Sequence, residues 1–136
     1  FANESFMLVV AKDSLEHFEF PEKVIREVER VLKPAGTLVI WVPFLYPFHG
    51  DDYWRFTPLV LKRMLIRFRI VRFDTPLWVF SILSLAIIDL MKRMRLGCLE
   101  QVIRNWAWRL DRICLRLRPG PRSFAGAYLI VAELQE

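Results

Sequence analysis

The N-terminal third of the chain alternates between continuous apolar runs and a segment with helical spacing. Residues 6–11 are apolar and rich in β-branched side chains, which predicts a strand buried on both faces, as in parallel sheets. Pro21 then opens a helix, because its fixed φ and missing N–H cost nothing in a first turn. Residues 37–44 form a second apolar run, so the segment predicts a strand–helix–strand unit with a right-handed crossover. The apolar positions of the helix share one stripe: Val24, Ile25, Val28, Val31 and Leu32.

A short helix and two more strands are predicted after this unit. Residues 58–67 begin with proline and have helical spacing. Residues 68–73 alternate between apolar side chains and arginine, which indicates an edge strand with one face in water. Residues 128–134 form a final apolar strand.

The segment between these two strands has a different pattern. Residues 77–90 are apolar except for two serines and an aspartate, but the run is too short for a membrane span, which needs about 20 apolar residues. Residues 91–117 predict a basic amphipathic helix that breaks near Gly97. We therefore expect a helical insertion between two strands.

Charge is concentrated in the same region. The formal net charge is +5, and residues 92–122 hold nine lysines and arginines against two acidic residues. Three interpretations stay open: residues 77–118 lie on an anionic membrane, with Trp106 and Trp108 at the interface; they bind nucleic acid; or they cover the sheet with their arginines in water. The last is favoured, and nucleic acid is favoured least.

Composition narrows the class of protein. The 136 residues suffice for one modest domain, and 54% of them are hydrophobic, so some apolar surface needs a partner, a membrane or further sequence. The two cysteines, Cys98 and Cys114, match neither a disulfide framework nor metal-ligand spacing, so no metal is expected. The chain starts at Phe1 without a signal-peptide pattern, which we interpret as a fragment or a processed chain in the cytoplasm, peripheral at a membrane if the basic segment binds one.

Side chains suited to binding or catalysis are most concentrated in residues 45–57. This segment is too long and too polar for a plain connector. A histidine, carboxylates, aromatic side chains and an arginine follow the second apolar strand there. In open α/β sheets, ligands bind outside the carboxyl ends of the strands. This loop therefore predicts a ligand site.

Four segments of the chain form a linked set of motifs. They are the first strand with DSLEH at 13–17, REVERVLKPAG at 26–36, LVIWVPF at 38–44, and HG with DYWRFT at 49–57. In this order they resemble the second half of class I S-adenosylmethionine-dependent methyltransferases of the type-11-like branch. The resemblance covers residues 1–73, and the strand near 127–134 gives weaker support.

The resemblance implies an α/β fold, the C-terminal half of a Rossmann-like seven-stranded sheet with an added helical insertion. The chain would supply strands four to seven, with strand seven antiparallel between strands five and six. Residues 1–136 would then be one partial methyltransferase domain. It would consist of a core and lid loop (1–76), the basic helical insertion (77–122) and a closing strand (123–136).

The resemblance also implies that the cofactor site is incomplete in this chain. The family holds S-adenosylmethionine with a glycine-rich turn after strand one and an acidic residue after strand two, and neither is present in this sequence. Met7 stands where the family usually has aspartate, and Ala35 replaces the first glycine of a turn. We expect Gly36 to supply the positive φ of that turn.

By the same resemblance, Asp13 and Leu15 would contact the cofactor. His17 and His49 are candidate catalytic residues, as a base or as substrate contacts. A base is needed only if the methylated atom carries a proton. Alternatives remain open for these positions: a loop turn, a core leucine and a histidine that caps the next helix.

The loop that follows would contact the acceptor. Asp52, Tyr53, Trp54 and Arg55 are the candidate acceptor-binding residues, with the aromatic rings as pocket walls and Arg55 as a clamp for an anionic group. Loop closure, anchoring to the core and an ion pair between Arg55 and a nearby aspartate are the alternatives.

Two functions follow as hypotheses. The chain is the C-terminal part of a methyltransferase for a small-molecule or lipid/glycan-type acceptor, inactive alone, or it is a non-enzymatic module that binds a membrane or partner through residues 77–118. In either case, an open apolar edge on the first strand would favour self-association.

Overall fold

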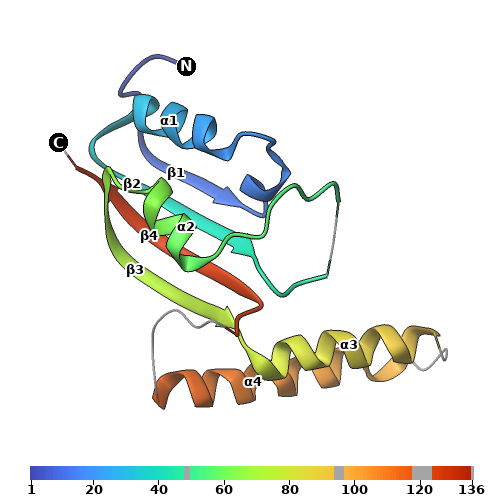
Figure 1. Cartoon of the computed structure of the whole chain (residues 1–136). Helices are drawn as coiled ribbons and strands as arrows, with labels where there is room; N and C mark the ends of the chain where they lie inside the picture. Colours follow the sequence, from blue (N-terminus) through green and yellow to red (C-terminus); the bar gives the residue numbers. More distant parts are fainter. Residues whose placement is uncertain (48–49, 94–96, 118–123, 136) are drawn as a thin grey trace.

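The computed structural model of the chain describes residues 1–47, 50–93, 97–117 and 124–135 (Figure 1). A four-stranded sheet carries two helices on one face. A separate pair of helices lies beyond one end of the sheet (Figure 1). The strands are β1 (Phe6–Lys12), β2 (Leu32–Pro43), β3 (Phe68–Leu77) and β4 (Ala127–Leu134). The helices are α1 (Pro21–Val31), α2 (Pro58–Met64), α3 (Val79–Arg93) and α4 (Glu100–Leu117), with short 3₁₀ turns η1 (Leu15–His17) and η2 (Gly97–Leu99).

The sheet order is β1-β2-β4-β3. β1 and β2 are parallel and joined through α1, whereas β4 is antiparallel to both of its neighbours, β2 and β3. The last strand of the chain is thus inserted between two earlier strands. This confirms the predicted fold class, a partial α/β sheet with its final strand antiparallel at an internal position.

The hydrophobic core lies between the sheet and the helices α1 and α2. The alternate β2 residues Leu38, Ile40 and Val42 are fully buried and pack with Ile25 of α1 and Leu61 of α2. Tyr128, Ile130 and Ala132 of β4 complete this face. Burial raises the pKa of the Tyr128 phenol, because the ionised form would lose its water.

The opposite face of the sheet is much less covered. Val39 and Trp41 of β2 and Leu129 and Val131 of β4 point there and are half-buried. Along β1, Met7, Leu8 and Val10 are 59%, 54% and 60% exposed. The prediction that this strand is buried on both faces was therefore wrong for this chain. The described helices α1 and α2 cover one face, and β1 is an edge strand.

The predicted turn at residues 34–36 falls within the bounds of β2, where the pairing with β1 is irregular, and it differs from the prediction in one residue. The positive φ falls on Ala35, at 57°, and not on Gly36. Gly36 is still required, because a Cβ there would lie 2.8 Å from the carbonyl oxygen of Lys33 and 3.0 Å from Leu32 Cδ2. Gly36 therefore permits close approach, while Ala35 takes the left-handed conformation.

The helical insertion is an antiparallel hairpin of α3 and α4 (Figure 1). The sequence predicted a basic helix over residues 91–117 that breaks near Gly97. The structure has this break, since α3 ends at Arg93 and α4 starts at Glu100, but Met91 to Arg93 belong to α3. The fully buried carboxylate of Asp111 accepts hydrogen bonds from the backbone N–H groups of Trp78, Phe80 and Ser81, at 2.9, 3.0 and 2.9 Å. Asp111 thereby caps the start of α3 and fixes α4 against it.

Candidate functional site

The loops that follow β1 and β2 start at the same edge of the sheet, because the two strands are parallel neighbours. Asp13 ends β1, and its backbone N–H donates to the carbonyl oxygen of Trp41 at 3.0 Å. Asp13 also has a positive φ of 45°, a conformation in which aspartate is more common than most residues. Its partly exposed carboxylate stands at the carboxyl end of the strand.

The loop after β2 docks on the 3₁₀ turn η1 after β1. The carbonyl oxygen of Glu16 accepts the backbone N–H groups of Tyr53 and Trp54, at 2.8 and 3.3 Å. Leu15 is only 1% exposed and belongs to the core, and the side chain of Glu16 is fully buried. Glu16 was not among the sequence candidates, although it lies inside the DSLEH motif, since a glutamate in a loop is usually in water.

Asp52 joins the two loops through its side chain. One carboxylate oxygen lies 3.2 Å from His17 Nδ1, and the other accepts Arg55 Nη2 at 2.7 Å. The side chain of Asp52 is 1% exposed, that of Arg55 21% and that of His17 34%. Arg55 also donates to the carbonyl oxygen of Tyr46 at 3.3 Å. A buried carboxylate between two basic groups holds the loop in one conformation.

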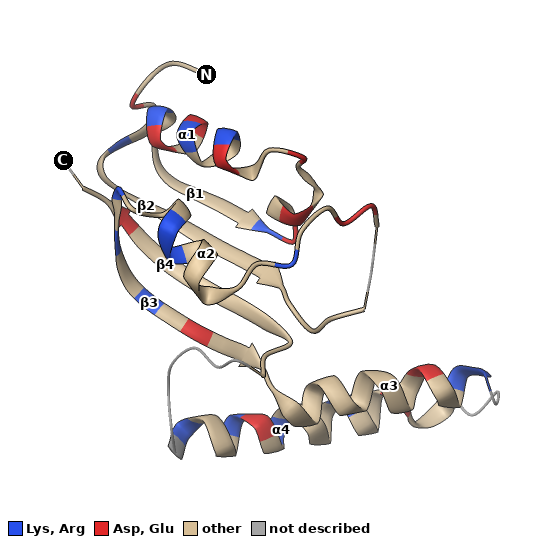
Figure 2. Cartoon of the chain, viewed as in Figure 1, with Lys and Arg blue, Asp and Glu red and all other residues tan. Residues whose placement is uncertain are grey.

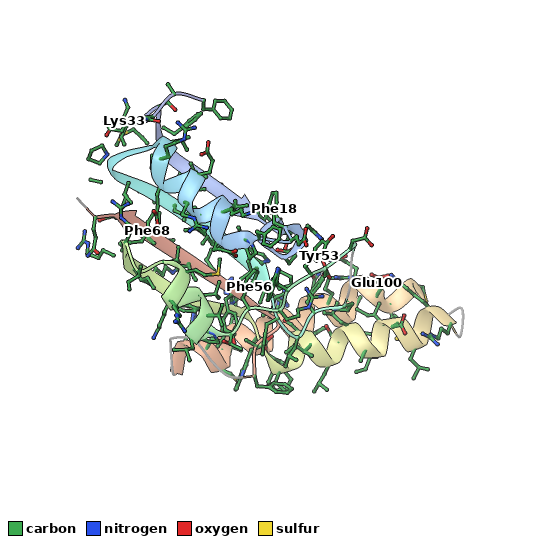
Figure 3. The ribbon with its side chains drawn as sticks, turned by 45° about the horizontal axis from the view of Figure 1, so that its top comes forward. Phe18, Lys33, Tyr53, Phe56, Phe68 and Glu100 are labelled. Carbon is green, nitrogen blue, oxygen red and sulfur yellow. The ribbon has the colours of Figure 1, made fainter. Side chains whose placement is uncertain are left out.

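The aromatic residues of the loop are placed differently from one another. Phe56 is 2% exposed and enters the core, and the ring of Trp54 stacks on it with centroids 6.4 Å apart. Trp54 Nε1 donates to the carbonyl oxygen of Glu19 at 3.3 Å, which ties this ring to the segment before α1. Tyr53 is 61% exposed and is the most accessible of the three (Figure 3). His49, the second candidate catalytic residue, lies outside the described residues.

A hollow of about 290 Å³ opens at the carboxyl ends of β1 and β2. Its lining includes Asp13, Trp41 and Tyr46, and Asp13 is the one sequence candidate among the described lining residues. Tyr46 and Leu77 also line a second hollow, of about 370 Å³, between the loop and the α3–α4 hairpin. The sequence gave no reason to single out Trp41 or Tyr46, because an aromatic residue in an apolar run is usually core.

The structure thus brings the sequence candidates together in two groups. His17, Asp52 and Arg55 form the cluster that joins the loops, while Asp13 faces the hollow. Among the described residues, no group of three histidine, cysteine or acidic side chains is arranged to hold a metal ion.

Comparison with known proteins agrees with this architecture. Residues 1–40 match a family model described as a methyltransferase domain. No curated protein matches the sequence. The resemblance found in the sequence is confirmed over these residues.

Solved structures extend the likeness to the whole chain. The chain superposes on the [4+2]-cyclase SpnF with a TM-score of 0.58 and 20% identity, covering 99% of this chain and 52% of the cyclase. An S-adenosylmethionine-dependent methyltransferase from Mesorhizobium loti gives 0.51 and 18%, with 96% and 63% covered. Phosphoethanolamine N-methyltransferase 2 of Haemonchus contortus, in complex with S-adenosyl-L-methionine, gives 0.57 and 16%, with 100% and 35% covered.

These likenesses define the class of fold. The chain has the fold of part of a class I methyltransferase domain, and it spans about half the length of the cyclase, the first of these structures. Since identities are at or below 20%, the structures establish the fold alone.

Proposed function

We propose that the chain is the C-terminal part of an S-adenosylmethionine-dependent methyltransferase that acts on a small-molecule or lipid/glycan-type acceptor. The observation that carries this proposal is the cluster of His17, Asp52 and Arg55, which joins the loops at the carboxyl ends of β1 and β2. Ligands of open α/β sheets bind at this edge. The family match over residues 1–40 and the fold support the same class.

The described residues fit one wall of a cofactor site. The hollow at the strand ends offers the Asp13 carboxylate and the rings of Trp41 and Tyr46, which suit a positively charged sulfonium and an adenine ring. Leu15 is buried, so its role would be to support the floor beneath that wall. When bound, S-adenosylmethionine supplies a methyl group on a sulfonium, for an in-line displacement by the acceptor.

The loop residues would position the acceptor. Tyr53 is exposed enough to contact it directly, whereas Trp54 and Arg55 are already held by Glu19 and Asp52 and would shape the pocket from behind. His17 keeps a partly exposed ring, with Nδ1 turned to Asp52. It would accept the acceptor's proton where one must leave. Positioning of this kind supplies much of the rate of a displacement.

The proposal requires that the sheet formed by residues 1–136 is only part of the complete sheet. β1 is an apolar edge, and the sheet face opposite α1 and α2 displays Leu8 and Val10. A preceding segment with the glycine-rich turn would pair with β1 and cover this face. Residues 1–136 alone would then be inactive and would self-associate through the β1 edge.

Calorimetry with S-adenosylhomocysteine tests the proposal. We expect no binding to residues 1–136, and binding once the chain is extended by the sequence that its gene encodes before Phe1. Tight binding to residues 1–136 would place the cofactor elsewhere. A folded extended chain without binding would remove the proposed function.

Transfer of a labelled methyl group to small-molecule and lipid fractions then tests the site. In the extended chain, His17→Ala and Tyr53→Ala should lower methyl transfer by about tenfold or more while S-adenosylhomocysteine binding stays intact. Ile66→Ala is the matched control, because Ile66 is 78% exposed and lies outside the loops. Unchanged transfer in both site variants would show that the acceptor side is assigned wrongly.

A further inference from the structure

The α3–α4 hairpin has many large apolar side chains outside and mostly small or polar ones inside. Among the described residues it buries Ser81, Ser84, Ala107 and Asp111, with Ile88 as the one large apolar side chain. Its exposed large apolar residues other than Trp108 are 40% to 59% exposed: Leu83, Ile87, Leu90, Leu99, Val102, Trp106, Leu110 and Ile113. We call these eight residues the outer face. This arrangement is the reverse of a hairpin that is covered by water alone.

The two helices present their exposed apolar residues on the same side. Leu83, Ile87 and Leu90 form one stripe on α3, and Val102, Trp106 and Ile113 belong to one stripe on α4. In each helix the stripe is centred roughly 130° from the buried residues, in the same rotational sense, at 100° per residue. Because the helices are antiparallel (Figure 1) and pack through their buried sides, the two stripes lie on the same side of the hairpin.

The outer face points away from the rest of the molecule. The opposite side of the hairpin supplies Leu85 and Trp108 to the hollow shared with Tyr46. Farther along α4, Leu115 of that same side faces Thr75 of β3 across a third hollow. The sheet therefore lies on the far side from the outer face. A segment that completed the sheet would pair with β1, at the edge opposite β3, and would leave the outer face open.

Basic groups border this apolar surface. α4 carries four arginines and two acidic residues, and both acidic side chains already have partners within the hairpin. Glu100 pairs with Lys92 and Arg104, and Asp111 is buried as the cap of α3. The pairing with Arg104 and Lys92 lowers the pKa of Glu100. The charged residues of α3 gather toward its C-terminal end, so most of that helix is uncharged (Figure 2).

Arginines and tryptophans are paired along α4. The guanidinium of Arg109 lies 5.7 Å from the ring centroid of Trp106, which belongs to the outer face, and that of Arg112 lies 4.5 Å from that of Trp108. The second pair lies on the sheet side of the hairpin, where Trp108 and Arg112 line hollows. Tryptophan prefers the boundary between water and lipid, and arginine binds lipid phosphates bidentately. A partner protein would satisfy the apolar residues equally well, but Arg109 beside Trp106 complements an anionic surface.

We propose that the outer face of the α3–α4 hairpin binds the surface of an anionic lipid bilayer. The hairpin lies flat, with the outer face in the boundary between headgroups and acyl chains and Arg109 at the phosphates. No helix among the described residues is long and apolar enough to cross a membrane. The mode of binding is therefore peripheral.

Vesicle sedimentation tests the proposal on the full chain. We expect residues 1–136 to bind phosphatidylcholine vesicles that contain one quarter phosphatidylglycerol, and to bind pure phosphatidylcholine about tenfold or more weakly. The double variant Leu110→Asp/Ile113→Asp should weaken binding to anionic vesicles by about a hundredfold, because two carboxylates would enter the lipid boundary. Leu59→Asp/Ile66→Asp is the matched control, since these residues are 76% and 78% exposed and lie outside the hairpin.

The charge contribution is tested separately. Arg109→Gln should weaken binding to anionic vesicles by about fivefold and leave binding to neutral vesicles unchanged. Circular dichroism confirms that each variant keeps its helices. Wild-type chain that stays in the supernatant with anionic vesicles, or equal binding by the hairpin and control double variants, would overturn the proposal.

A second copy of the chain is the competing occupant. Light scattering that shows a dimer, dissociated by Leu110→Asp/Ile113→Asp but not by Leu59→Asp/Ile66→Asp, together with no vesicle binding, would assign the outer face to self-association and overturn the proposal. Neither result bears on cofactor binding by the extended chain, so the proposed function stands or falls independently.

Discussion

The sheet with its two helices and the α3–α4 hairpin distribute apolar residues in opposite ways. α1 buries Ile25, Val28 and Val31 against the sheet and turns most of its charged residues to water. The hairpin buries two serines, an alanine, an aspartate and one isoleucine, and it turns most of its leucine and isoleucine residues and its tryptophans outward. The difference indicates that residues of this chain cover the α1 side of the sheet, whereas the apolar outer face of the hairpin is suited to contact with a surface outside the chain.

The largest effect expected from this comparison concerns isoleucines in the two regions. Ile130→Ala should lower the free energy of unfolding by about 3 kcal/mol, because Ile130 is fully buried in the sheet core and its removal leaves a cavity. Ile113→Ala, the same substitution on the outer face, should cost about 0.5 kcal/mol or less, because this side chain is 59% exposed. Urea denaturation of both variants measures the difference. Equal losses would mean that the outer face is covered in the free protein.

The next effect concerns a buried polar contact that holds the hairpin together. Asp111→Ala should cost about 2 kcal/mol, because three backbone N–H groups at the start of α3 lose a charged acceptor. The loss should be local, so hydrogen exchange should quicken at Trp78, Phe80 and Ser81 while the β4 amides stay protected.

Asp89→Ala is the control for that measurement. Asp89 lies on the same hairpin, but its side chain is 67% exposed and pairs with Arg93, so its removal should change exchange little. If Asp111→Ala quickened exchange equally in β4 and in α3, the hairpin and the sheet would unfold as one unit. The two regions would then not differ in local stability.

The sequence predicted the sheet region well because its pattern is satisfied within the chain. Apolar runs at 6–11 and 37–44 and the stripe on α1 have the periods of a strand–helix–strand unit, and they fold as one. The antiparallel position of β4 between β2 and β3 was expected from the resemblance alone, since no local pattern encodes strand order. The burial of β1 was mispredicted because periodicity cannot show whether a second cover is present.

The site was predicted in part for a similar reason. DSLEH and the loop at 50–57 stood out by composition, but their joining by Asp52 and the Glu16 backbone depends on a contact between distant segments. The hollow with Trp41 and Tyr46 depends on strand register and on where the hairpin sits. Composition identifies polar residues in loops, and it gives no signal for an aromatic residue that borders a cavity.

The smallest effect concerns the sheet region and should leave the local stability of the hairpin unchanged. Ala35→Gly should raise the free energy of unfolding by about 1 kcal/mol, because Ala35 has a φ of 57° and glycine adopts this conformation without the clash of a Cβ. Gly36→Ala is the matched control, and it should destabilise, because its Cβ would lie 2.8 Å from the carbonyl oxygen of Lys33. Urea denaturation gives both signs, and exchange at Trp78 and Phe80 should be the same in both variants. Stabilisation by Gly36→Ala, or loss of stability in Ala35→Gly, would show that the strain in this turn sits at the other residue, where the sequence had placed it.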